Sequence, residues 1–538
     1  NNPYRHPERA RRTRNVVIGQ LVKYHKISSA EGARLKGLDL GVREGVKRQT
    51  HNMGIATYFR EYVRGWVKQQ IDEKNIRIVK NGKKVTPNIY TDGLKIYTTI
   101  DPRMQAHAET AVKLHLKEHQ QKLFQNLKKR EPWKRDTTIL YRAMRRSARY
   151  NVLRTQGASH AEARASFYRK VPMRLFTWNE PGFVDTVMTP WDSLQYYAPF
   201  LQVGMVSINP ANGHIKTWVG GLDNQFFQYD HVGHGKRQVG STFKPFVYAA
   251  AFDNGFSPCK EESNEQVTIV TDLGEEWTPK NFDNKYGGSM TLKKALMLSI
   301  NVITARLINQ VGAHEVIKYA HNMGIQTPLE PYPSISLGTF DLSVLELTSA
   351  YATMANRGKW HEPIFVTHIE DKDGNLLYRF VGDTREALSE ETSYLMADAL
   401  RAVVTGGTAA NLHHQYQVPF DIFVAGKTGT TQDYSDGWFV GFTPLLATGV
   451  WVGCSDRSVH FNWSVEGQGG RMAMPIFGHY TRLIYSDSTL RLDRLARIAP
   501  PLRLKVETDC ERYRENRTST TKIFAKDPKT GDLFYNED

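Results

Sequence analysis

A serine and a lysine stand three residues apart where a basic, glycine-rich stretch turns apolar. They are Ser241 and Lys244 in HGKRQVGSTFKPFVYAAAFDNG. A lone S-x-x-K is usually just the start of a capped helix. The spacing also places both side chains on one helical face, where the amine can reach the hydroxyl. We therefore predict that Ser241 caps a helix and is also a candidate nucleophile, with Lys244 as its base.

Lysine acts as a base at neutral pH only when its pKa is lowered. A drop of about three units needs roughly 4 kcal/mol against the charged form, which burial and a second cation can supply. Lys427 in AGKTGTT offers that cation on a predicted edge strand. Thr428 and Thr430 alternate along the strand, and Gly429 between them is expected to let a ligand lie against the backbone. K-T-G alone more often marks an ordinary strand and turn.

A third polar pair interrupts an apolar helical pattern. Ser299 and Asn301 lie in ALMLSINVITARL, where a helix break is usually no more than a cap. The combination is far more specific than any of its parts, because S-x-x-K, S-x-N and K-T-G follow one another in this order. The set resembles that of the penicillin-recognising serine acyltransferases, which are the penicillin-binding proteins and the serine β-lactamases.

Within that superfamily the chain resembles a bimodular class A penicillin-binding protein. NPYRHPERARRTRNVVIGQLVKY is similar to the last helices of the glycosyltransferase domain, YTTIDPRMQAHAE to the segment that links the two domains, and KTGTTQDYSDGWFVGFTP to the family's form around K-T-G. The glycosyltransferase signature E-D-x-x-F-x-x-H-x-G does not occur in these residues. We therefore expect no glycan polymerisation by this chain, whereas the resemblance implies that activity for a parent protein with an upstream part.

The resemblance implies a role for each motif residue. Ser241 attacks the carbonyl of the penultimate D-Ala of a peptidoglycan stem peptide, D-Ala leaves, and an amine of a neighbouring stem resolves the acyl-enzyme. Lys244 as a free amine takes the Ser241 proton. Ser299 relays a proton toward the leaving amine, and Asn301 orients Lys244 and the substrate amide.

The K-T-G strand is expected to hold the substrate. Lys427 keeps the site electropositive and attracts the terminal carboxylate, which Thr428 and Thr430 hydrogen-bond beside Gly429. The oxyanion hole implied by the resemblance uses the backbone N–H groups of Ser241 and Thr430. We expect no metal and no cofactor.

Two absences favour a transferase over a hydrolase. Class A β-lactamases carry a deacylating glutamate in E-x-x-L-N and use S-D-N, whereas this sequence has no E-x-x-L-N and reads S-I-N. The acyl-enzyme should therefore persist until an amine arrives, and acylation by β-lactams should be long-lived. Two alternatives stay open: a D,D-carboxypeptidase, and a β-lactam sensor domain, against which the glycosyltransferase-like NPYRHPERARR argues.

The elements that must position these residues predict an α+β fold. The resemblance implies the penicillin-recognising transpeptidase fold, an antiparallel five-stranded sheet flanked by helices, preceded by a helical fragment and a mixed linker domain. The expected divisions are 1–40 for the end of a truncated glycosyltransferase domain, 41–200 for a linker with a basic insertion at about 116–170, 201–490 for the transpeptidase domain, and 491–538 for a loosely attached tail. Residues 13–36 predict two helices with Ser28 or Ser29 as an N-cap, and Asp101 marks the start of another helix.

Composition limits the partners. The 538 residues carry a net charge of +16, which implies an acidic partner such as nucleic acid, an anionic membrane or an anionic polymer. Residues 122–154 hold eleven Lys or Arg against two acids. We expect a solvated basic helix there, since no Gly-aromatic pattern typical of nucleic-acid binding accompanies the charges, and we expect no nucleic-acid partner. The expected partners are stem peptides, lipid-linked glycan and β-lactams, with cell-wall synthesis regulators as a further option.

No run of 18 apolar residues and no signal peptide is present, so we expect an anchor in a missing upstream segment and an extracytoplasmic, periplasmic location. Three cysteines predict neither a zinc site nor a dense disulfide framework, although one bridge can form. Four histidines are expected in surface loops: His231, His234, His413 and His414. Asp436 and Trp438 are expected to serve the strand and cleft architecture rather than chemistry.

Overall fold

The computed structural model describes residues 3–4, 6–42, 54–128, 130–270, 274–462 and 464–514, together with two short strands near the C-terminus, β21 (Ala525–Lys526) and β22 (Leu533–Phe534). It divides into two compact units, Asn1–Met53 and Gly54–Asp538. Each unit is described by itself.

The first unit is a pair of helices, α1 (Pro7–Lys23) and α2 (Ser29–Gly37). Ser28 caps α2 by accepting a hydrogen bond from the Glu31 N–H at 3.1 Å, which satisfies one of the free amides of the first turn. A Cβ at Gly32 would lie 2.3 Å from Cγ2 of Val22, so the absence of a side chain lets the helices pack closely. The predicted helix pair and cap are confirmed.

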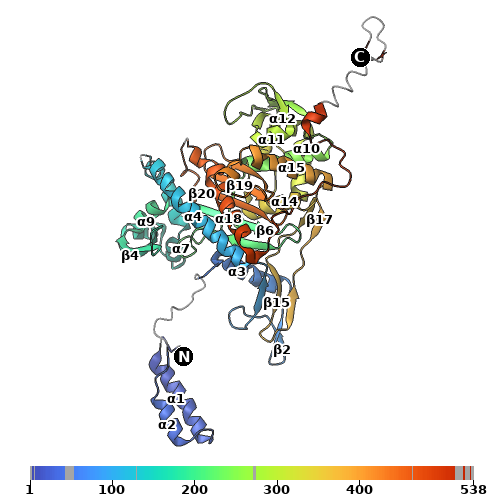
Figure 1. Ribbon diagram of the computed structural model, residues 1–538. Coiled ribbons are helices and arrows are strands. Elements are labelled where there is room, and N and C mark those ends of the chain that lie inside the picture. Colours follow the sequence, from blue (N-terminus) through green and yellow to red (C-terminus); the bar gives the residue numbers. More distant parts are fainter. Residues whose placement is uncertain are drawn as a thin grey trace. The chain divides into compact units, whose positions relative to one another are not determined.

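The second unit is built on a five-stranded antiparallel sheet, as predicted, with strand order β18-β19-β20-β6-β7 (Figure 1). A hairpin near residue 210 supplies two strands, and the K-T-G region supplies the other three. The strands are β6 (Leu201–Ile208), β7 (Ile215–Val219), β18 (Ala425–Thr430), β19 (Asp436–Phe442) and β20 (Ala447–Cys454).

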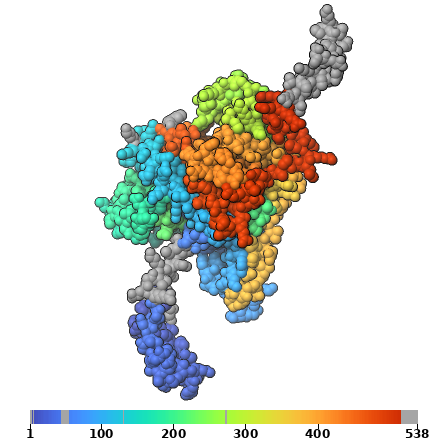
Figure 2. All heavy atoms as spheres, in the orientation of Figure 1, coloured from blue at the N-terminus to red at the C-terminus, as the bar shows by residue number. Residues whose placement is uncertain are grey.

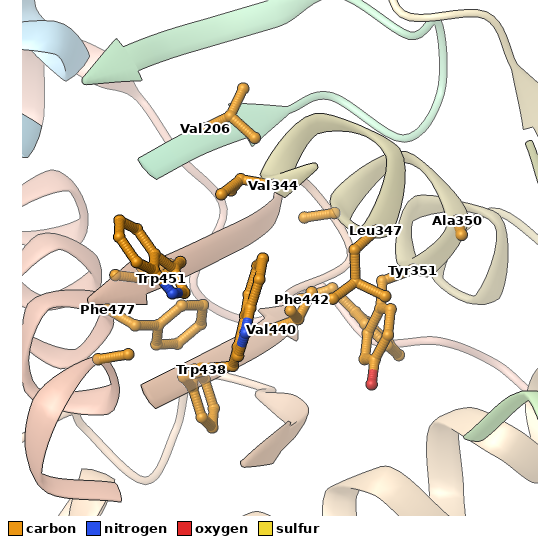
Figure 3. Close-up of a cluster of buried hydrophobic side chains, with 14 of the residues drawn as sticks. Val206, Val344, Leu347, Ala350, Tyr351, Trp438, Val440, Phe442, Trp451 and Phe477 are labelled. Carbon is orange, nitrogen blue, oxygen red and sulfur yellow. The ribbon is translucent and has the colours of Figure 1, made fainter. Parts of the chain in front are cut away.

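Helices cover both faces of this sheet. On one face α14 (Val344–Ala355) packs so closely that a Cβ at Gly449 would meet Oγ1 of Thr348 at 2.0 Å. On the other face α18 (Met474–Ser486) places Phe477 against Phe439 of β19, with ring centroids 4.8 Å apart. Figure 3 shows how the α14 side chains gather with those of the sheet: Val344, Leu347 and Tyr351 with Trp438, Val440 and Trp451. Helix α17 (Gly469–Met472) and the long α4 (Pro102–Leu127) pack against α18.

A second group of helices carries the motif residues. The turn η2 (Gly240–Phe243) leads into α10 (Lys244–Asp253), whose residues up to Phe252 are buried. Packed around it are α11 (Leu292–Leu298), α12 (Asn301–Val311), α13 (Ala313–Asn322) and α15 (Glu390–Gly406). Helix α15 also packs on β18, so this group and the K-T-G strand share one core.

The linker region joins residues that are distant in sequence. After α3 (Thr57–Glu73), the strand β3 (Lys95–Thr98) becomes the edge of a three-stranded sheet with β15 (Val366–Glu370) and β16 (Leu376–Arg379). The predicted helix start at Asp101 is confirmed, because its carboxylate accepts hydrogen bonds from the first amides of α4.

Short elements complete the second unit: β1 (Ile78–Lys80), β2 (Lys83–Val85), β8 (Lys236–Gln238), β9 (Glu261–Ser263), β10 (Ile269–Val270), β11 (Glu276–Trp277), β12 (Ser289–Thr291), β13 (Asp341–Ser343), β14 (Lys359–His361), β17 (Thr384–Glu386), α16 (Asn411–His414), η3 (Pro333–Leu337), η4 (Val465–Gly467) and η5 (Ser488–Leu490).

The basic insertion is a packed region, and the prediction of a solvated basic helix is wrong. The chain from residue 132 to 197 forms α5 (Pro132–Arg135), α6 (Thr138–Arg146), α7 (Ala148–Thr155), α8 (His160–Ala165), η1 (Ser166–Tyr168), β4 (Val171–Phe176), β5 (Phe183–Met188) and α9 (Pro190–Tyr197). Apolar side chains between the cations are buried: Trp133, Ile139, Leu140, Met144 and Phe167. The cyan-to-teal residues of this region gather on one side of the second unit (Figure 2). In the sequence, the surrounding charge hid the helical spacing of these buried apolar side chains.

The predicted loose tail is wrong for residues 491–514. Cys510 forms a disulfide with Cys259, and the Arg514 guanidinium pairs with Glu261 at 2.5 Å. A covalent link across 251 residues has no signature in a sequence with three scattered cysteines. Apart from the β21–β22 strand pair, residues 515–538 lie outside the described residues. In the part of the chain that is described, no helix combines the length and the apolarity needed to cross a bilayer.

Candidate active site

Ser241 lies in a tight turn ahead of the helix, so the prediction that it caps the helix is wrong. It belongs to the 3₁₀ turn η2, no side-chain cap bond is made, and the Lys244 N–H donates to the Ser241 carbonyl. Residues i and i+3 are eclipsed in a 3₁₀ turn, so Ser241 and Lys244 still share one face. Gly240 has φ +55°, and a Cβ there would lie 2.9 Å from the Thr430 carbonyl oxygen. The nucleophile turn therefore lies directly against the end of β18.

The Lys244 amine is fully buried and held by the S-x-N segment. Its Nζ bonds to the Ser299 carbonyl oxygen at 2.5 Å, to Oγ of Ser299 at 3.2 Å and to Oδ1 of Asn301 at 2.7 Å. Burial, and then the charge of Lys427, hold the pKa of Lys244 well below its usual range. This is the condition that a lysine base requires. Among the described residues, Lys244 makes no hydrogen bond to the Ser241 hydroxyl, and such contacts often tighten only when substrate is bound.

Ser299 owes its position to an unusual backbone conformation. It is left-handed (φ 61°, ψ 39°) and ends α11, and α12 begins two residues later at Asn301. A non-glycine residue in this region costs free energy, so the surrounding structure must hold it there. The break turns the carbonyl and hydroxyl of Ser299 and the amide of Asn301 toward the same amine. The predicted interruption of the helix is confirmed.

Lys427 supplies the second buried amine. It is fully buried on β18, and its Nζ donates to Oγ of Ser299 at 2.8 Å and to the Thr428 carbonyl at 3.1 Å. Burial lowers the pKa of Lys427 to about 7. Oγ of Ser299 thus lies between the Lys244 and Lys427 amines. The structure brings all three sequence motifs together at one hydroxyl.

The two threonines of the K-T-G strand are half-buried. Oγ1 of Thr428 lies 2.8 Å from Oγ1 of Thr408, and Oγ1 of Thr430 accepts the Gly469 N–H at 2.9 Å. Gly429 has a packing role that the sequence did not predict. A Cβ there would lie 2.8 Å from the Val239 carbonyl oxygen and from the Thr242 side chain, so this glycine lets β18 pack against the nucleophile turn.

Comparison with known proteins shows the family of the chain. Residues 203–477, about half of the chain, match the model of the penicillin-binding protein transpeptidase domain. The chain belongs to the penicillin-binding protein family. Residues 121–201 match the penicillin-binding protein middle domain, so the segment expected as an insertion is largely part of a domain known in this family.

Relatives and solved structures extend over most of the chain. Penicillin-binding protein 1A of Aquifex aeolicus (strain VF5) is 30% identical over 492 residues, which are 90% of this chain and 64% of that relative. The chain thus spans less than two thirds of that relative's length. The crystal structure of penicillin-binding protein 1A from Haemophilus influenzae shares the fold with a TM-score of 0.63 at 21% identity, covering 93% of this chain and 79% of the other. The PonA1 protein of Mycobacterium tuberculosis in complex with penicillin V gives 0.53 at 22%, covering 80% and 93%.

Sequence reasoning missed the residue that holds the S-x-N segment. Asn281 is 3% exposed, and its Oδ1 accepts the backbone N–H groups of Asn301 and Val302, both at 3.1 Å. Its Nδ2 donates to Oδ1 of Asn264 at 2.8 Å. Asn281 thereby caps α12 from a distant loop, in place of a local cap. An asparagine in a polar loop gives no sequence signal for such a contact.

The remaining polar candidates serve the architecture. The buried Asp436 carboxylate accepts from Nε of Arg237 at 2.6 Å and from Nε1 of Trp451 at 2.9 Å. Trp438 donates to the Gln238 carbonyl at 2.8 Å. As predicted, Asp436 and Trp438 make structural contacts.

The expectation of surface histidines is wrong for two of the four. His231 is 6% exposed and stacks on Trp451, and His413 is 8% exposed and stacks on Phe420. His231 is buried against an aromatic ring from a distant strand, and His413 against one from the loop that follows its own helix. His234 and His414 are exposed as expected.

Proposed function

We propose that this penicillin-binding protein is a serine D,D-transpeptidase that cross-links peptidoglycan stem peptides and is acylated by β-lactams. The observation that carries the proposal is the chain of two buried lysine amines joined through Oγ of Ser299, beside the turn that holds Ser241. Burying two amines costs folding free energy, and groups with pKa values perturbed in this way are typical of catalytic sites.

In the proposed reaction Lys244 is the base that accepts the proton of the nucleophile. Neutral Lys244 takes the proton of Ser241 as Oγ attacks the penultimate D-Ala carbonyl, and the ester forms as the peptide bond breaks. The proton passes through Ser299 to the leaving D-Ala amine. An amine of a second stem then attacks the ester, gives up a proton along the same route, and releases Ser241 with its hydroxyl restored. Asn301 holds Lys244 in place and faces the substrate amide.

Charge stabilisation comes from the β18 side of the site. The backbone N–H groups of Ser241 and Thr430 form the oxyanion hole in this proposal, supported by the lack of room for a Cβ between Gly240 and the Thr430 backbone. Lys427 attracts the terminal carboxylate, which Thr428 and Thr430 hydrogen-bond alongside Gly429. The penicillin V bound to the M. tuberculosis relative supports β-lactams as covalent inhibitors here.

Wider properties of the protein also belong to this proposal. The disulfide between Cys259 and Cys510 supports an oxidising, extracytoplasmic location. A membrane anchor and a glycosyltransferase domain in an upstream segment, lipid-linked glycan and cell-wall synthesis regulators are inferred from the class A resemblance. So are the divisions at residues 1–40, 41–200 and 201–490.

The test that separates the candidate activities uses a stem pentapeptide donor with an amine acceptor. We expect cross-linked dimers and free D-Ala from the native protein, and neither from Ser241→Ala. The variant Ser193→Ala, which removes a half-buried hydroxyl in α9, is the matched control and should retain both products. Trimmed stems without dimers would favour the D,D-carboxypeptidase, and acylation by β-lactam without any turnover of stems would favour a β-lactam sensor domain.

A further inference from the structure

A cavity lies between the middle-domain helices and the start of the transpeptidase domain. Its volume is about 810 Å³, within the usual range for ligand pockets, and domain boundaries are common places for such pockets. Helices α6 and α9, the loop before β8, and β8 itself form its walls. No residue proposed for acyl transfer lines it, so it is separate from the active site.

Two polar side chains in the wall of this cavity have hydrogen-bonding groups without a partner. Nδ1 of the buried His231 has none among the described residues, although its ring is fixed by stacking on Trp451. Arg237 uses Nε for Asp436 and Nη2 for the Cys454 carbonyl, which leaves Nη1 without a partner in the described part of the chain. Buried polar groups are nearly always satisfied, so Nδ1 of His231 points to a ligand or water, and Nη1 of Arg237 is available as a donor beside it.

The charge of the cavity selects an anion. Arg146 and Lys236 are exposed at the cavity, where Nζ of Lys236 donates to Oγ1 of Thr327 at 2.8 Å, and the charge of Arg237 is paired with Asp436 at 2.6 Å. Asp456 is the acidic side chain among its described lining residues, and Arg142 already pairs with it at 2.8 Å. Arg146 is the lining cation without a side-chain partner among the described residues, so a ligand carboxylate gains attraction there.

Apolar side chains occupy the opposite part of the wall, from α6, α9 and the loop before β8: Ile139, Leu140, Ala143, Leu194, Ala198 and Phe226. A small anion such as phosphate would leave this surface unused. A short peptide that combines carboxylates with small apolar side chains matches both parts of the cavity.

We propose that this cavity binds an uncross-linked stem peptide, separately from the donor and acceptor at Ser241. The choice of a stem rests on the proposed function, because stems are the acidic peptides this protein would meet. Arg146 takes a carboxylate, while Nη1 of Arg237 and Nδ1 of His231 bond to the peptide backbone. The site adjoins the nucleophile, since β8 runs from the cavity to the turn that holds Ser241.

The test measures binding of fluorescein-labelled L-Ala-γ-D-Glu-L-Lys-D-Ala-D-Ala by anisotropy, with and without prior acylation by benzylpenicillin. We expect saturable binding that survives acylation, because penicillin blocks only the active site. Arg146→Glu should weaken this binding at least about tenfold by reversing a charge at the cavity. The matched control Arg145→Glu changes an exposed neighbour that does not line the cavity, and should stay within about twofold. Ala143→Trp, which fills the cavity without changing charge, should also weaken binding.

Three results would overturn the proposal: no saturable binding to the acylated protein, equal weakening by the two arginine variants, or equally tight binding of an all-L acidic peptide of the same charge. The last would show a general anionic-peptide site. Labelling of Ser241 by penicillin is read in the same samples and reports the proposed function independently. The comparison of the arginine variants without penicillin remains decisive even if acylation fails.

Discussion

Replacing Lys427 with methionine should raise the pKa of Lys244 and slow acylation at neutral pH. The two amines approach Oγ of Ser299 at 3.2 Å and 2.8 Å, so they lie within about 6 Å of each other. At an effective dielectric constant of about 20, two charges at this distance repel by about 3 kcal/mol, or about two pKa units. Because burial lowers the pKa of Lys427 to about 7, it is about half protonated at pH 7, and this figure is an upper limit there.

The assay is the rate of acylation by a fluorescent penicillin at saturating concentration, measured from pH 5 to pH 10. Lys244 must be neutral to accept the Ser241 proton, so the rate rises with pH through the pKa of Lys244. In Lys427→Met the rising limb should move upward by as much as about two units. The rate at pH 7 should fall by up to about 100-fold and recover toward high pH. Saturation separates this effect from weaker binding of the antibiotic carboxylate.

Lys427→Arg is the control that keeps a cation at the same position. It should place the rising limb at the native position or lower, even if its rates are lower, because arginine stays charged across this pH range whereas Lys427 is about half neutral at pH 7. Circular dichroism and melting temperature establish that both variants fold. If the limb in Lys427→Met stays where it is in the native protein, the charge of Lys427 does not keep Lys244 neutral, and the electrostatic reasoning is refuted.

Three further predictions concern the structure around the site. Asn281→Ala should lower the free energy of unfolding by about 1–3 kcal/mol, because it leaves two α12 amides unpaired, and should slow acylation. Denaturant melts measure the loss of stability, and a normal acylation rate in the variant would contradict the positioning role of Asn281. Acidification should destabilise the fold through His119, because burial lowers its pKa to about 4 and the unfolded chain binds the proton first; the loss begins near pH 6.5, reaches about 3 kcal/mol at pH 4, and should be smaller in His119→Gln by thermal melting. Cys510→Ser should cost about 2–5 kcal/mol and make unfolding insensitive to reductant, whereas Cys454→Ser, at the free buried cysteine, should keep the reductant effect.

The sequence was most informative where chemistry demands particular residue types at fixed spacing. Ser241, Ser299 and Lys427 were chosen from motif order alone, and the structure places their segments in contact. The five-stranded sheet could be predicted from the resemblance, and the α4 start at Asp101 from its cap residue, because that signal is local.

Long-range contacts were beyond the reach of the same reasoning. Asn281 acts on α12 through a fold-dependent contact, and the pairing of Cys259 with Cys510 joins segments 251 residues apart. The tight turn at Ser241 was mistaken for a capped helix start because both have the same residue pattern. In the region at 116–170, net charge concealed apolar positions that tertiary packing buries.

The most direct test of the central claim is intact-mass analysis after exposure to benzylpenicillin, followed by peptide mapping of the adduct. We expect one covalent penicilloyl group on Ser241, stable over many minutes and absent from Ser241→Ala. The Ser193→Ala control should be labelled like the native protein. An adduct on another residue, or full labelling of Ser241→Ala, would contradict the assignment of Ser241 as the nucleophile.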